Sequence, residues 1–159
     1  MLVCALLVAG SMFTPAQPAH AQQDLKTRIE TALELINKGS REVLDEELML
    51  TDSEKAAFWP LYDKYVAERR VIGERYVRLI GAYLDRYTAG SLTNDDADII
   101  LDAFFDIEMD TLQLRQRYVR RFRKILPGIK VARFFQLESK IRAEVDRALA
   151  LAIPLADPR

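Results

Sequence analysis

Cysteine and histidine are almost absent from this sequence of 159 residues. Cys4 and His20 are the only residues of these two types, and both precede Ala21. A chain that begins after Ala21 therefore has no thiol and no imidazole. This excludes Cys or His nucleophiles, a His general base and zinc sites built from these ligands. It also excludes disulfides, so stability has to come from helix packing alone.

An excess of charge of one sign is also lacking. The sequence has 23 Lys and Arg against 24 Asp and Glu, which gives a net charge of −1. Half of its residues are apolar and 30% are charged, a composition typical of folded, soluble domains. Several basic residues gather between Arg115 and Lys124, but the balanced total predicts no nucleic-acid binding.

The first 21 residues have the pattern of a secretory signal peptide. Residues 1–13 are uncharged and mostly apolar, and Ala19-His20-Ala21 has the small residues of a cleavage site. The apolar run is shorter than the roughly 20 residues of a membrane span, so we expect no stable membrane insertion after cleavage. The predicted product is one domain of residues 22–159, located in the periplasm.

The rest of the chain predicts an all-α fold, because no segment alternates between polar and apolar residues with period two. Thr51 with Glu54, and Thr93 with Asp96, have the spacing of capping boxes at helix starts. Glycine and proline separate the amphipathic segments. The predicted helices cover residues 24–38, 50–87, 93–125 and 129–152.

The two central segments are similar in length and joined by about five residues, a length that favours an antiparallel hairpin. Each carries one long apolar stripe at helical spacing. We therefore expect an elongated hairpin with shorter terminal helices packed on it. The stripe residues are Phe58, Tyr62, Tyr65, Ile72, Tyr76, Leu79 and Tyr83 in the first segment, and Ile100, Phe104, Ile107, Thr111, Leu114, Tyr118, Phe122 and Ile125 in the second.

The first central segment has a second apolar set, which consists of Val66, Val77, Ile80 and Leu84. Together the two sets are more than one partner helix can cover. The second set therefore predicts either a surface that binds other polypeptides or the contact face of a homodimer.

Arg69, Glu108 and Arg115 interrupt otherwise apolar seams near the middle of the predicted helices. Either they lie exposed at the stripe edge, where ion pairs contribute little, or they form a partly buried cluster that fixes helix register. A third interpretation, a hydrolase that uses Glu108 or Glu138, has the least support. The sequence offers no Gly-rich loop, metal ligands or nucleophile nearby, so we expect no enzyme and no cofactor.

Five aspartates recur on the helix face opposite Phe104. Their position near a helix start predicts a solvated acidic face, since the helix dipole favours negative charge there. A calcium loop is poorly supported, because the required glycine and glutamate positions hold Ile99 and Phe105. The aspartates are Asp95, Asp98, Asp102, Asp106 and Asp110.

Several motifs resemble those of the Spy/CpxP-like group of exported bacterial proteins, which is marked by Leu-Thr-x-x-Gln. They are Leu50-Thr51-x-x-Glu54, Leu92-Thr93, and Leu126-Pro127 followed by Lys130-Val131-Ala132-Arg133-Phe134-Phe135. Residues 57–62, 122–127 and 136–138 are similar to a proteobacterial family of uncharacterised exported proteins. Glu54 and Asp96 stand where the motif has glutamine, and Pro127 stands where a third motif has threonine.

The resemblance implies an all-α periplasmic protein, often a cradle-shaped homodimer, of the ATP-independent chaperone or envelope-stress kind. We therefore expect a helical binding protein whose partners are unfolded or partner polypeptides. The alternative is a structural or adaptor homodimer without chaperone activity.

Overall fold

The computed structural model describes residues 41–158, and this part of the chain is all α. A short helix over residues 41–48 precedes α2 (Asp52–Thr88), α3 (Asn94–Phe122) and α4 (Gly128–Ala152). The predicted fold class is thus confirmed. The predicted signal peptide and the helix over residues 24–38 lie outside the described residues. None of the described helices is both long enough and apolar enough to span a membrane.

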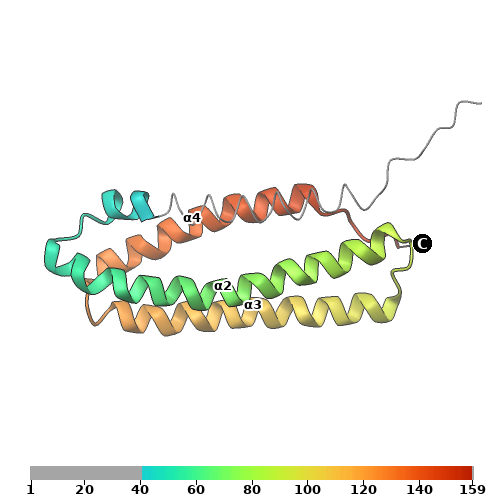
Figure 1. Cartoon of the computed structure of the whole chain (residues 1–159), viewed down its shortest axis with the longest axis horizontal. Helices are drawn as coiled ribbons and strands as arrows, with labels where there is room; N and C mark the ends of the chain where they lie inside the picture. Colours follow the sequence, from blue (N-terminus) through green and yellow to red (C-terminus); the bar gives the residue numbers. More distant parts are fainter. Residues whose placement is uncertain (1–40, 159) are drawn as a thin grey trace, which may run out of the picture.

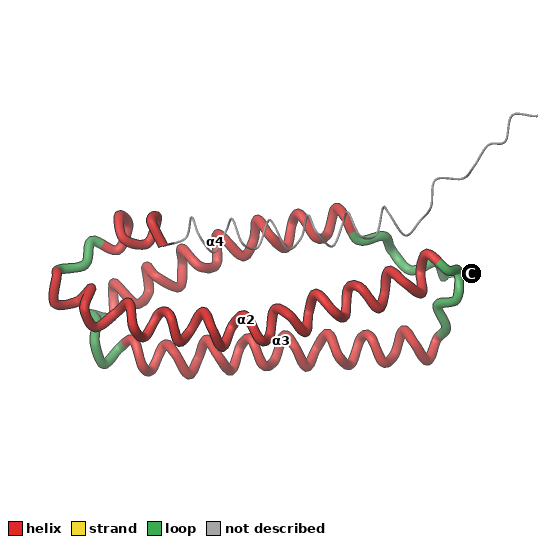
Figure 2. Tube along the Cα trace, viewed as in Figure 1, coloured by secondary structure: helices red, strands yellow, loops and turns green. Residues whose placement is uncertain are grey.

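The three long helices lie along one another in an elongated arrangement (Figure 1). α2 and α3 run side by side in opposite directions, as predicted for the two central segments, and α4 returns from the far end of α3 (Figure 2). With 25 residues, α4 is almost as long as the 29-residue α3. It covers almost the range predicted for the last helix, residues 129–152, and is shorter than both α2 and α3.

Both predicted capping boxes are present. The Thr51 hydroxyl accepts a hydrogen bond from the backbone N–H of Glu54, and the Glu54 carboxylate accepts one from the backbone N–H of Thr51. Thr93 and Asp96 repeat this exchange at the start of α3. Lys130 of α4 donates to Glu54 over 2.7 Å and lowers the pKa of that carboxyl group. The start of α2 is thereby tied to the first turn of α4.

The core has two parts. The larger one joins the short helix of residues 41–48 to the beginning of α2, the end of α3 and the beginning of α4, and the smaller one lies near the other end. The aromatic residues buried in the larger cluster are Phe58, Tyr62, Tyr65, Tyr118, Phe122 and Phe134. The smaller cluster consists of Ile80, Leu84 and Leu149. Aromatic packing thus concentrates where four helical segments meet.

Two loop residues have left-handed backbone conformations, Met49 with φ 47° and Gly90 with φ 62°. This region favours glycine, since a side chain there costs about 1 kcal/mol. Because the Met49 side chain is exposed, Met49→Gly should raise the free energy of unfolding by about 0.5–1 kcal/mol. Gly90→Ala should lower it by about 1 kcal/mol although a Cβ would meet no atom. Urea denaturation measures both, and a loss of stability in Met49→Gly would contradict the argument.

Candidate functional site

A buried ion cluster lies at the middle of the molecule and is centred on Glu138 of α4, which is 8% exposed. The Tyr65 hydroxyl donates a hydrogen bond to its Oε1, and Nη1 of Arg69 lies 3.6 Å from the same oxygen. Nε of Arg115 lies 3.1 Å from Oε2, without the alignment of a hydrogen bond. One carboxylate therefore connects α4 to α2 through Tyr65 and Arg69, and to α3 through Arg115.

A second cluster of the same composition is centred on Glu68 of α2. The Tyr118 hydroxyl donates to Glu68 over 2.6 Å and Arg117 donates over 2.7 Å, and both contacts lower the pKa of that carboxyl group. The rings of Tyr118 and Tyr65 are 5.0 Å apart, so the two clusters meet in the core. Burial raises the pKa of Tyr65, and the Glu138 carboxylate raises it further. Burial and the hydrogen bond to Glu68 also raise the pKa of Tyr118, so both tyrosines are neutral hydrogen-bond donors.

The predicted register cluster of Arg69, Glu108 and Arg115 needs one correction. Arg69 and Arg115 do meet at a buried carboxylate, but it belongs to Glu138. Glu108 binds Arg142 instead, over 2.8 and 3.0 Å, and its side chain is 42% exposed. The spacing could have shown this, because Glu138 lies four residues after Phe134 and therefore on the core face of its helix.

The second apolar set predicted as an exposed face also needs a correction. Ile80 and Leu84 are buried against Leu149 of α4, and Val77 packs on the same cluster. Val66 packs on the larger core cluster. The returning α4 covers this side of α2, so Ile80 and Leu84 are intramolecular core, and Val66 and Val77 lie partly buried beside the core. The reason for expecting a homodimer contact at these four residues therefore falls away.

The exposed apolar surface lies instead on α3, beside the face where the sequence showed a row of aspartates. We call it the outer stripe of α3, and it consists of Leu101, Phe105, Met109 and Leu112, which are 53%, 64%, 54% and 49% exposed. At 3.6 residues per turn the four side chains project within about 80° of the helix circumference. Their spacing of four, four and three residues was visible in the sequence. It was overlooked because the core stripe and the aspartates share the same helix.

Carboxylates border the outer stripe along the first half of α3. Asp98, Asp102 and Asp106 are exposed, and none of them has an ion-pair partner among residues 41–158. Asp110 differs, because Arg75 of α2 binds it. Apolar side chains beside unpaired carboxylates make a surface suited to segments that carry both apolar and cationic residues.

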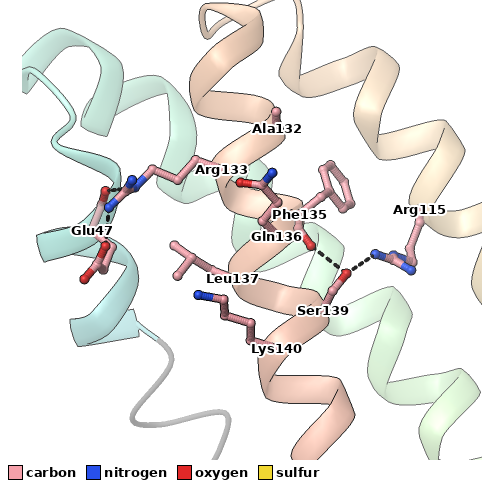
Figure 3. A pocket seen from close by; sticks show the side chains of 9 residues that line it. All are labelled: Glu47, Arg115, Ala132, Arg133, Phe135, Gln136, Leu137, Ser139 and Lys140. Carbon is pink, nitrogen blue, oxygen red and sulfur yellow. Dashed lines mark hydrogen bonds and ion pairs between the residues drawn. The ribbon is translucent and has the colours of Figure 1, made fainter.

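An open hollow of about 740 Å³ lies between α4 and the short helix of residues 41–48 (Figure 3). Its cationic side chains are Arg115, Arg133 and Lys140. Arg133 is bound to Glu47, and Arg115 contacts Glu138 and Ser139. The two arginines are therefore occupied by side chains of the protein rather than presented to an anion.

Within the described chain, no group of three or more His, Cys, Asp and Glu side chains could hold a metal ion. In comparisons with known proteins, no family model matches the sequence, and no characterised protein and no solved structure is significantly similar to it. Any assignment of function therefore has to be argued from the geometry of this chain.

Proposed function

We propose that this protein is a periplasmic binding protein that holds unfolded or partner polypeptides without using ATP. The observation that carries the proposal is the outer stripe of α3, four apolar side chains that remain about half exposed in the folded chain. The resemblance of the helix-start motifs to Spy/CpxP-like proteins agrees with such an activity. Removal of residues 1–21 on export belongs to the same proposal.

The outer stripe supports reversible capture on physical grounds. Burial of apolar surface gains about 25 cal/mol per Å², so a few hundred Å² of contact offsets part of the entropic cost of binding. The surplus is small, which keeps the bound segment exchangeable. The unpaired carboxylates beside the stripe attract cationic segments and speed their association. A bound segment can therefore leave again without nucleotide hydrolysis.

A structural or adaptor homodimer is the second candidate, and the charge distribution along α3 favours it. The carboxylates border the first half of the outer stripe, whereas Arg120 and Arg123 lie exposed at the end of the helix. The hydrolase alternative finds less support. Arg142 binds Glu108, and a hydroxyl and two arginines surround Glu138, an arrangement suited to holding helices together.

The test is aggregation of an unfolding reporter protein without ATP. The wild type should slow aggregation, and Phe105→Asp should abolish the effect by placing a charge in the middle of the stripe. Val71→Asp is the matched control, since Val71 is 58% exposed on α2 outside the stripe. Circular dichroism should show that both variants remain folded. If the wild type leaves aggregation unchanged, or if both variants act like it, the proposal is wrong.

A further inference from the structure

On α3, which carries the outer stripe, the acidic and the basic side chains that form no ion pair with a described residue lie at opposite ends of the helix. Asp98 and Asp102 are exposed beside its first half, and Arg120 and Arg123 are exposed at its other end. None of these four side chains forms an ion pair with another described residue. They project toward the same side of the helix as the stripe. The face is therefore apolar in its middle, acidic at one end and basic at the other.

Such a surface is complementary to the same surface on a second copy whose helix runs in the opposite direction. We propose that two copies of this chain pair antiparallel along the outer stripe of α3, with the two-fold axis between Met109 and Leu112. In that register Met109 lies opposite Leu112 of the partner subunit. Phe105 then lies opposite Gln116 of the partner subunit. The exposed apolar side chains of both copies are covered at once, as an isologous interface requires.

The same register also pairs the charges. Asp98 lies opposite Arg123 of the partner subunit, and Asp102 lies within one residue, about 1.5 Å along the helix axis, of the position opposite Arg120 of the partner subunit. The two-fold axis repeats each contact, so four ion pairs border the interface. Parallel pairing would instead place like charges together, which costs free energy and selects the antiparallel orientation. Charge complementarity therefore identifies the occupant of the stripe as a second copy.

The pairing would regulate the capture of client polypeptides. This regulation rests on the proposed function, because pairing and capture use the same stripe. A paired molecule has its stripe covered, so a client polypeptide has to displace the partner copy. Capture per protomer should then fall as the protein concentration rises above the dissociation constant of the pair.

Single and mixed charge reversals test the register. Asp102→Arg and Arg120→Asp should each weaken self-association about tenfold or more, because each creates like-charge contacts at both ends. A one-to-one mixture of the two variants should pair again, since every contact between unlike copies then joins an arginine to an aspartate. Sedimentation equilibrium across protein concentrations measures all three samples and the wild type.

Leu112→Asp should also abolish pairing while its thermal unfolding stays near that of the wild type, and Val71→Asp should leave pairing unchanged. A wild type that remains monomeric at about 100 µM overturns the inference. A dimer whose dissociation constant is unchanged by the charge reversals overturns it as well. If such a monomer still slows aggregation, the proposed function stands alone. If the charge reversals weaken pairing and their mixture restores it, but the protein never slows aggregation, the pairing stands and the capture proposal fails.

Discussion

Glu138→Ala is expected to lower the free energy of unfolding by about 3 kcal/mol, since it removes a buried carboxylate on which two partly buried arginines converge. Arg69 and Arg115 both converge on Glu138, and the Tyr65 hydroxyl also donates to it. In the alanine variant both guanidinium groups lose the negative charge on which they converge, and the Tyr65 hydroxyl loses its acceptor, all in a poorly solvated place. The loss of unfolding free energy is therefore larger than the contribution of any one of these contacts.

Glu108→Ala is the matched control. It removes a carboxylate from another ion pair between α3 and α4, but the Glu108 and Arg142 side chains are 42% and 36% exposed, so water still reaches both. We expect a loss of about 0.5 kcal/mol or less, as for other surface pairs. Urea denaturation of the two variants compares them directly. Equal midpoints would contradict the distinction between a buried and an exposed pair.

Glu138→Gln separates the hydrogen bond from the charge. The amide oxygen can still accept from Tyr65, whereas the negative charge that faces Arg69 and Arg115 is removed. We expect this variant to retain part of the stability that Glu138→Ala loses, because the tyrosine hydroxyl keeps an acceptor. A glutamine variant as unstable as the alanine variant would assign the whole effect to charge.

The helices could be predicted because their signals are local. The two capping boxes lie within four residues each, and both are formed as the sequence indicated. The amphipathic stripe of α2 also follows from spacing alone, and Phe58, Tyr62 and Tyr65 on it are buried. Short-range hydrogen bonds and helical periodicity determine such features with little help from the rest of the chain.

The partners across helices were harder to predict, because they depend on where α4 lies. Its return along α2 buries Ile80 and Leu84 against Leu149, and it brings Glu138 rather than Glu108 to the two arginines. Both errors arose because the extent of the last helix was predicted, but not which faces of α2 and α3 it covers. An apolar set is exposed only if no other element covers it, and one helix pattern cannot show that.

Phe134→Ala is expected to cost about 4 kcal/mol, as for other fully buried phenylalanines. Phe134 is 1% exposed, and its ring centroid lies 4.9 Å from that of Phe122 on α3 and 5.6 Å from that of Phe58 on α2. The ring thus joins α4 to both other long helices. Its removal leaves a cavity where three helices meet, and aromatic side chains around it cannot easily collapse into the space.

The control is Phe105→Ala, which deletes the same atoms from a ring that is 64% exposed on the outer stripe of α3. This variant should lose about 0.5 kcal/mol or less, since surface substitutions seldom cost more. Urea denaturation followed by circular dichroism gives both values. Similar losses in the two variants would place Phe134 outside the core. A large loss of unfolding free energy confined to Phe134→Ala would instead show that aromatic contacts hold α4 in place. It would also show that the Phe105 side chain of the outer stripe contributes little to stability.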